Sequence, residues 1–406
     1  MPSDADHLPG DPVEDPPIDL PRPSGFPAGF GEGTGEPDAV LVLRCLLGIT
    51  PRSLHDVIWA TGSATAAVAA IQAGSAGSDN DRDFLKEADP GRIRRHVGDA
   101  GARFAQPGDP DYWPAFLRLT DPPVGIFLRG RPLAPGHDRV AVVGSRRPSA
   151  VGKAVARDLG RGLAAAGIVV TSGGALGIDA RSHEGALDAG GITVAVLGSG
   201  IDIEYPATNR RLLQQICERG TLVSEYPPGV PAEPFRFPAR NRLIAGLSRA
   251  VVIVEGVARS GTRSTADYAT QLGLDVFAVP GPVTNALSET PLALLRDGAR
   301  LIRDASDLLA DLGFEPGALS TEGFTSPDGL PPDQRRVLEV LAEPMLPDAV
   351  ARAAQLSVSA AVTTLIHLEL RGLIQGVGGR YRRAAGFHMP EPVAQQQVPE
   401  ASVTEG

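Results

Sequence analysis

Five short apolar runs, each rich in valine and each ending in or just before a glycine, constrain the fold of this chain most strongly. They are RVAVVGS (139–145), GIVVTSG (167–173), ITVAVLGSG (192–200), AVVIVEG (250–256) and DVFAVPG (275–281). Continuous apolar runs of this length are typical of parallel strands that are buried on both faces. Longer helical segments such as VGKAVARDLGRGLAAAG lie between them. This alternation predicts an α/β fold with a doubly wound, Rossmann-like parallel sheet.

The composition changes along the chain and suggests further domains. Residues 39–105 carry helical patterns and predict a small helical domain of SAM or helix–hairpin–helix type, whereas residues 106–312 carry the strand and helix alternation. Residues 313–330 are rich in glycine, serine and proline and predict a linker. Three helical patterns and the Gly-Gly turn of LIQGVGGRYRRA predict a winged helix over 331–386. Residues 387–406 are polar and predict a disordered tail.

The negative charge of the chain is concentrated at its start. The formal net charge is −10, but residues 1–38 hold nine acidic side chains and one basic one, which leaves a nearly neutral remainder. This segment is also rich in proline and glycine, so we predict a disordered tail that contributes nothing to the fold or to DNA affinity. The overall charge therefore does not exclude a nucleic-acid partner.

Several features indicate a reducing cytoplasm. No run of about 20 apolar residues is present, and the start lacks the basic and apolar regions of a secretory signal. The two cysteines, Cys45 and Cys217, lie far apart in apolar helical contexts, so each is predicted to be a buried hydrophobic residue.

Glycine-rich turns follow the predicted strands, at the edge where open α/β sheets bind ligands. Exposed backbone N–H groups at such turns suit phosphates. The turns are GSRRPS (144–149), TSGGALGID (171–179), GSGID (198–202), EGVARSGTRST (255–265) and PGPVTN (280–285). The first has neither G-x-G-x-x-G nor GxxxxGK[ST], which excludes a dinucleotide fingerprint and a P-loop.

Two basic elements are candidates for binding a polyanion at this edge. Arg146 follows the first strand beside Ser145 and is interpreted as a phosphate ligand; the alternative is that it pairs with an acid and closes the loop. The stretch FRFPARNRLIAGLSR (235–249) holds four arginines and no acid. Arg236, Arg240 and Arg242 are predicted to point toward the same edge.

The same stretch carries two aromatic rings. Phe235 and Phe237 are predicted to lie on one side of an extended loop, before a helix that begins at about Ala239. Rings interleaved with arginines suit single-stranded nucleic acid, although we expect one of the two to cover the core.

No catalytic constellation is found. Asp179 and His183 stand four residues apart, where a local hydrogen bond is favoured over a metal site because no third ligand is in view. Ser260 and Gly261 open a helix and predict either an anion site or an N-cap. Glu225 and Glu255 lie at strand ends without a nucleophile, and no G-x-S-x-G elbow occurs. We predict no enzyme activity, no metal and no cofactor.

Several motifs in one order resemble the DprA (Smf) family of DNA-processing proteins. They include VAVVGSRRPSAVG, SGGALGIDARSHEGAL, FPARNRLIAGLS and SGTRSTA, and the resemblance covers roughly residues 106–310. It implies a non-enzymatic protein that binds single-stranded DNA in a basic pocket of an extended Rossmann domain. It also implies protection of incoming strands in transformation, loading of RecA recombinase, and a homodimer formed through the Rossmann domain.

The family's pocket arginine corresponds to Arg146, and its FPxRNR element falls on Phe237, Pro238, Arg240, Asn241 and Arg242. The DNA-binding residues predicted from the turns and the resemblance together are Gly144, Ser145, Arg146, Ser172, Gly173, Gly174, Arg236, Phe237, Arg240, Asn241, Arg242, Ser260 and Gly261. The chain departs from the family's pattern at Gly174, at Arg263 and in SETPL (288–292).

Two other functions remain open at this point. The same sheet edge could hold a nucleotide in a phosphoribohydrolase-like enzyme, or sense a ligand in a winged-helix regulator of duplex DNA. The winged helix is only mildly basic, so we predict that it is an accessory domain that contacts a partner.

Overall fold

The computed structural model describes residues 25–133, 136–258, 260–314, 332–341, 343–370, 373–377 and 379–383. It divides into two compact units, Met1–Gly313 and Phe314–Gly406, which are described separately. Residues 1–24, nearly all of the predicted linker and the predicted tail at 387–406 lie outside the described residues.

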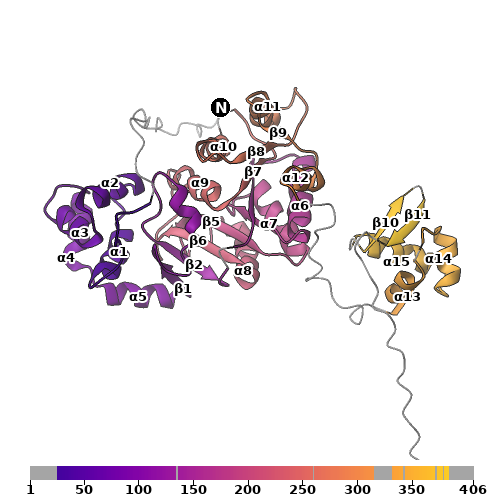
Figure 1. Ribbon diagram of the computed structural model, residues 1–406, viewed down its shortest axis with the longest axis horizontal. Helices are drawn as coiled ribbons and strands as arrows, with labels where there is room; N and C mark the ends of the chain where they lie inside the picture. Colours follow the sequence, from indigo (N-terminus) through magenta and orange to yellow (C-terminus); the bar gives the residue numbers. More distant parts are fainter. Residues whose placement is uncertain are drawn as a thin grey trace, which may run out of the picture. The chain divides into compact units, whose positions relative to one another are not determined.

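A nine-stranded sheet organises the described part of the first unit, in the order β1-β2-β6-β5-β4-β3-β7-β8-β9 (Figure 1). Neighbouring strands pair in parallel from β6 through β5, β4, β3, β7 and β8 to β9. At the other edge, β1 pairs with β2 and β2 with β6 in antiparallel. The strands are β1 (Ala102–Ala105), β2 (Ile126–Gly130), β3 (Arg139–Val143), β4 (Val169–Ser172), β5 (Thr193–Gly200), β6 (Thr221–Tyr226), β7 (Ala250–Ile253), β8 (Asp275–Ala278) and β9 (Arg300–Leu301). The predicted doubly wound α/β sheet is confirmed. The five valine-rich runs form β3, β4, β5, β7 and β8, the further strand predicted at GTLVSEY (220–226) is β6, and β1, β2 and β9 were not predicted.

The strand order places a topological switch between β3 and β7. From β3 the chain builds β4, β5 and β6 on one side, and then returns to build β7, β8 and β9 on the other. Ligands of open α/β sheets bind beside such a switch, at the carboxyl ends of the strands.

Helices cover both faces of the sheet. Helices α9 (Arg236–Leu247) and α10 (Gly261–Gln271), with the 3₁₀ turn η1 (Pro114–Arg118), pack on one face through a core that includes Trp113 and Phe116. Helices α7 (Ile178–Asp188) and α8 (Arg210–Arg219) join a second core with Leu213 and Ile216. The remaining elements are α6 (Ala150–Ala165), η2 (Ala207–Asn209), η3 (Ala286–Ser288), α11 (Glu289–Arg296) and α12 (Ala305–Asp311).

The N-terminal helices gather beside the β1 end of the sheet (Figure 1). They are α1 (Glu36–Arg44), α2 (Pro51–Thr61), α3 (Ala64–Gln72), α4 (Asp79–Glu87) and α5 (Pro90–Asp99), and they share a core of their own. No single helix in the described ranges is long and apolar enough to span a membrane; α2 and α3 pass such a test only together, with a bend of 107°. Both cysteines are free, and burial raises the pKa of the Cys45 thiol to about 12.

The prediction that residues 1–38 contribute nothing to the fold is wrong for residues 25–38. Phe26 and Phe30 stack with ring centroids 4.4 Å apart and join the core of the N-terminal helices. The Glu36 carboxylate accepts hydrogen bonds of 2.9 Å from the backbone N–H groups of Ala64 and Thr65, which open α3. Two aromatic rings and one capping carboxylate thus order a segment whose average composition predicts disorder. At the other boundary, residues 102–105 are a strand of the sheet and not part of the helical domain.

The second unit contains α13 (Pro332–Val340), α14 (Pro347–Ala353), α15 (Val358–Leu370) and the antiparallel strands β10 (Ile374–Val377) and β11 (Arg380–Arg383). Its core includes Val337, Leu341, Val350, Leu365 and Leu373. Three helices followed by a hairpin confirm the predicted winged helix.

Candidate nucleic-acid interface

Arg146 lies just beyond the carboxyl end of β3, at the topological switch, and its side chain is exposed. Among the residues that the structure describes, no acid pairs with it. Its guanidinium instead lies 5.0 Å from the centroid of the Phe237 ring. A guanidinium held against an aromatic ring keeps N–H groups free for a bidentate contact with phosphate. The alternative in which Arg146 closes its loop on an acid is therefore not observed in the described part of the chain.

Glu255 fixes the backbone that carries Arg146. The N–H of Ser145 donates to the Glu255 carbonyl at 2.7 Å, and the N–H and hydroxyl of Ser149 donate to the Glu255 carboxylate at 2.9 and 2.5 Å. A side chain at Gly144 would lie 2.8 Å from the Glu255 carbonyl oxygen, so only glycine fits there. This predicted strand-end acid therefore holds the first turn in place.

Helix α9 begins at Arg236, three residues earlier than predicted. Pro238 falls in its first turn, where a helix leaves N–H groups unbonded and proline is tolerated. Two residues apart on a helix, Phe235 and Phe237 point in roughly opposite directions, so their predicted placement on one side of an extended loop is wrong. Phe237 packs toward Gly198, where a Cβ would lie 2.8 Å from the ring, while Phe235 is 65% exposed.

The structure corrects the prediction that Arg236, Arg240 and Arg242 point toward the edge beside Arg146 as ligands: all three are buried, and their guanidinium groups bond within the fold. Arg236 pairs with Glu233 at 3.1 Å and lies over the ring of Tyr226. Arg240 donates to the carbonyl of Gly173 at 2.7 Å and to that of Val196. Each guanidinium finds partners inside the fold.

Arg240 nevertheless adds positive charge beneath the exposed site. Its guanidinium lies 6.0 Å from the Phe237 ring centroid, on which Arg146 also rests. Burial lowers the pKa of Arg240 to about 10; Asp179 opposes this shift and the charge of Arg146 adds to it.

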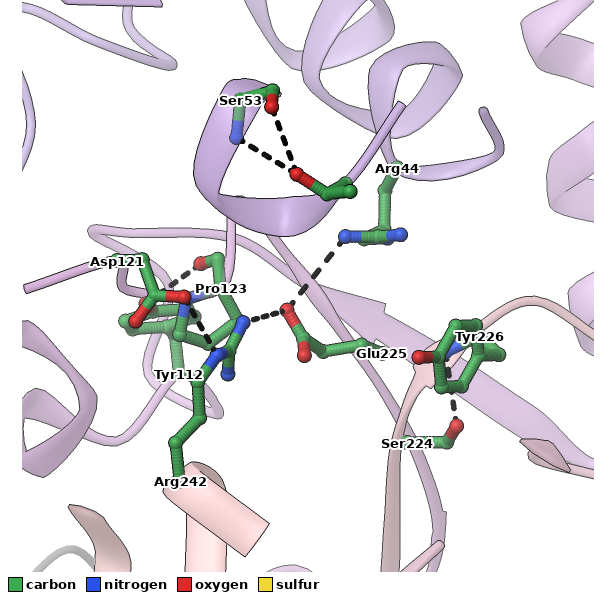
Figure 2. A network of polar contacts seen from close by, with 10 residues as sticks. Arg44, Ser53, Tyr112, Asp121, Pro123, Ser224, Glu225, Tyr226 and Arg242 are labelled. Atoms are coloured by element: carbon green, nitrogen blue, oxygen red, sulfur yellow. Dashed lines mark hydrogen bonds and ion pairs between the residues drawn. The ribbon is translucent and has the colours of Figure 1, made fainter. Parts of the chain in front are cut away.

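Arg242 is the centre of a buried ionic network (Figure 2). Its Nε atom lies 3.0 Å from Asp121 and its Nη2 atom 2.8 Å from Glu225, which also lies 3.6 Å from Arg44 of α1. Burial lowers the pKa of Arg242, but the two carboxylates outweigh it and raise that pKa above its usual range. Glu225 is thus an internal counterion that ties α1 and α9 to the end of β6.

The turn after β4 is occupied by an internal carboxylate. The N–H groups of Gly173 and Ala175 donate to Asp179 at 3.1 and 3.4 Å, and the Ser172 hydroxyl donates to the Val142 carbonyl at 2.7 Å. A side chain at Gly173 would lie 2.5 Å from the guanidinium of Arg240. Asp179 thus occupies the N–H group of Gly173, and Val142 the hydroxyl of Ser172, so neither donor is free for phosphate as it was expected to be. The role predicted for Gly174 stays a prediction.

Asn241 connects α9 with the start of α10. Its side-chain amide donates to the Gly261 carbonyl at 3.0 Å and to the Ser264 hydroxyl at 2.8 Å. Ser260 stands at the N-cap position but makes no capping hydrogen bond with its side chain, so the N-cap alternative is not observed for its hydroxyl.

Tyr205 is a neighbour of this site that the sequence analysis missed. It follows β5 at the same edge of the sheet, its side chain is 47% exposed, and its ring centroid lies 5.6 Å from that of Phe237. An aromatic residue shortly after the glycine turn GSGID was the available signal.

Asp179 and His183, the pair considered for metal binding or proton relay, have separate partners. The Thr193 hydroxyl donates to the Val170 carbonyl, so His183 Nδ1 must donate to Thr193 Oγ1, 2.6 Å away. Burial, with a smaller effect of Arg240, lowers the pKa of His183 to about 3. Within the described ranges, no three histidine, cysteine or acidic side chains are grouped as metal ligands would be.

His183 should make stability depend on pH. Its pKa is about 3 when folded, against about 6.5 when unfolded, so the unfolded state binds the proton more tightly. The contribution of the neutral His183 to the free energy of unfolding should be complete above about pH 6.5. Below that pH, the free energy should fall by about 1.4 kcal/mol per pH unit. The measurement is urea unfolding from pH 4 to 8 for the protein and for His183→Asn, whose amide can replace the Nδ1 donor. A difference between the two proteins that does not change with pH would contradict this account.

The chain matches known families over both units. Residues 103–313 match the family described as DNA recombination-mediator protein A, and residues 325–380 match the DprA winged helix domain. The chain belongs to the DprA (Smf) family. The resemblance predicted from the motifs is thereby confirmed.

Individual members of the DprA family are similar over most of the chain. A putative DNA processing protein DprA of Mycobacterium tuberculosis (strain H37Rv) is 40% identical over 304 residues, covering 70% of this chain and 77% of that protein. Protein Smf of Escherichia coli K12 is 39% identical over 288 residues, covering 68% and 76%. The crystal structure of DprA from Streptococcus pneumoniae superimposes with a TM-score of 0.60 at 32% identity, over 68% of this chain and 97% of that one.

The departures from the DprA pattern have local explanations. Gly174 has a φ of +66°, which favours glycine over a larger apolar residue. Arg263 pairs on the surface with Asp267 at 3.0 Å and with Asp297 at 3.2 Å. Within SETPL, the Thr290 hydroxyl donates to the Val257 carbonyl at 2.7 Å and so holds the loop after β7.

Proposed function

We propose that this protein binds single-stranded DNA at the carboxyl edge of β3, with Arg146 on a phosphate. The observation that carries the proposal is the exposed guanidinium of Arg146, which rests on Phe237 and has no acidic partner among the described residues. A cation beside aromatic rings suits a strand whose phosphates and bases are both accessible. Membership of a family described as a recombination mediator supports a DNA ligand.

Three of the acids near this edge are engaged within the fold, which also favours a polyanion. Glu255 is engaged by Ser149, Glu225 by Arg242 and Asp179 by the turn after β4. These three carboxylates are therefore neutralised or bonded inside the fold, and the charge left outside at Arg146 is positive. A positively charged surface attracts phosphate, and binding there requires no catalytic residues.

The wider role follows from family membership. We propose that the protein does not turn over its ligand, that it protects incoming single strands in the cytoplasm during transformation, and that it helps to load RecA recombinase. Two copies would pair through the Rossmann unit. The winged helix would serve as an accessory domain for a partner.

The test is a titration of fluorescent single-stranded and duplex oligonucleotides of equal length, at salt concentrations from about 50 to 200 mM. We expect tighter binding of the single strand, with a log–log salt slope of about −0.7 per neutralised phosphate. Removing residues 316–406 should leave this affinity unchanged. Equal or tighter binding of duplex would favour the winged-helix regulator, and hydrolysis of a nucleotide or oligonucleotide would favour the enzyme.

A further inference from the structure

We propose that Tyr205 is the surface on which a base of the bound strand stacks, while Phe237 supports both Tyr205 and Arg146. This inference rests on the proposed single-strand function and assigns different parts of the ligand to different residues. It concerns a side chain that lies outside the basic stretch and outside the glycine-rich turns themselves.

The exposure of the rings distinguishes their roles. Phe237 is only half-buried, but both the Arg146 guanidinium, at 5.0 Å from its centroid, and that of Arg240, at 6.0 Å, lie over the ring. Its edge also packs toward Gly198. The Phe237 ring is therefore less accessible to a base than the Tyr205 ring. Tyr205 is 47% exposed, and from the side of β5 it contacts the cluster formed by Phe237, Arg146 and Arg240 through the Phe237 ring.

The position of Tyr205 fits a nucleotide whose phosphate is held by Arg146. Both side chains rest against the one ring of Phe237, with the Tyr205 ring tilted by 36° to it at 5.6 Å. A strand that places a phosphate on Arg146 therefore carries a base within reach of Tyr205. Stacking on an aromatic ring accepts any base, which suits a protein that must bind strands of any sequence.

Phe235 is the other exposed ring near this edge, and it does not belong to the cluster. Arg236 lies 5.2 Å from its centroid, and Phe235 points to the other side of α9 from Phe237. At 65% exposure it is a matched control, because it is an accessible aromatic residue close to the site in sequence but outside the proposed stack.

The experiment compares oligothymidine with an abasic oligomer of the same length, which keeps the phosphates but has no bases. Tyr205→Ala should weaken binding of oligothymidine about five- to hundredfold, the loss expected for one stacked base. The salt slope should not change, because stacking releases no counterions. On the abasic oligomer, Tyr205→Ala and the unmodified protein should bind equally, and Phe235→Ala should resemble the unmodified protein on both ligands.

Two further variants keep the test decisive if Tyr205→Ala folds poorly. Tyr205→Phe should bind oligothymidine as the unmodified protein does, since the ring is retained. Tyr205→Trp should also bind, and oligothymidine but not the abasic oligomer should quench its added fluorescence.

Several outcomes would overturn the stacking role. They are an unchanged affinity of a folded Tyr205→Ala, an equal loss on the abasic oligomer, or a loss in Tyr205→Phe as large as in Tyr205→Ala. Failure of the unmodified protein to bind any single strand would overturn the proposed function itself.

Discussion

Replacing Arg146 with alanine should weaken single-strand binding about tenfold to a hundredfold, because a hydrogen bond to a charged group contributes about 1.5–3 kcal/mol. The side chain is exposed and has no acidic partner among the described residues, so its loss should not disturb the fold. The log–log salt slope should become shallower by about 0.7, the contribution of one phosphate on a single strand. Fluorescence titrations over a range of salt measure both quantities, and the melting temperature should stay constant.

Two variants provide the controls for this result. Arg146→Lys should recover only part of the affinity, since an ammonium cannot reproduce a bidentate fork. Arg147→Ala removes the same charge from the next position, which is also exposed but has no ring contact with Phe237, and it should cost less. Normal binding by Arg146→Ala together with a lower melting temperature would show that Arg146 is a structural residue of its loop.

Replacing Arg242 with methionine should lower the free energy of unfolding by about 3–5 kcal/mol, because it leaves the buried Glu225 and the partly buried Asp121 without their partner. Asp121 is then uncompensated, and Glu225 retains only the longer contact with Arg44 at 3.6 Å. Urea or guanidinium unfolding curves measure this loss. The effect should be on stability, since the side chain is 2% exposed and cannot reach a bound strand.

Arg263→Met is the matched control for this prediction. Arg263 also pairs with two carboxylates, Asp267 and Asp297, but all three side chains are at least 40% exposed. Exposed ion pairs contribute about 0–1 kcal/mol, so the control should change stability little. Similar losses in both variants would mean that burial does not determine the strength of the Arg242 network.

The strands and their carboxyl edge could be predicted from the sequence because both leave local signals. Runs such as RVAVVGS are short, apolar and closed by glycine, and each becomes a strand that ends at the binding edge, buried throughout except at the start of β8. Arg146 could be placed for the same reason, since it directly follows such a strand. The start of α9 was harder, because Pro238 in its first turn gives the same local signal as an extended segment.

The positions and contacts of the other arginine side chains could not be predicted, because their partners are distant in sequence. Arg242 pairs with Asp121 across 121 positions, and Arg240 donates to the carbonyl of Gly173 across 67. A stretch with four arginines and no acid therefore looked like a basic surface, although most of its charge is matched inside the fold. Tyr205 was missed because its role depends on a ring, Phe237, that only the folded chain brings near it.

The absence of a side chain at Gly173 has a consequence for any survey of mutations scored by DNA affinity. A side chain there would collide with the Arg240 guanidinium, which lies beneath the ring that supports Arg146. Every substitution at Gly173 should therefore score as a binding defect, with a sensitivity as high as that of a residue in contact with the strand. Such a survey would score Gly173 like a ligand contact even if its only part is to leave room for the buried guanidinium of Arg240.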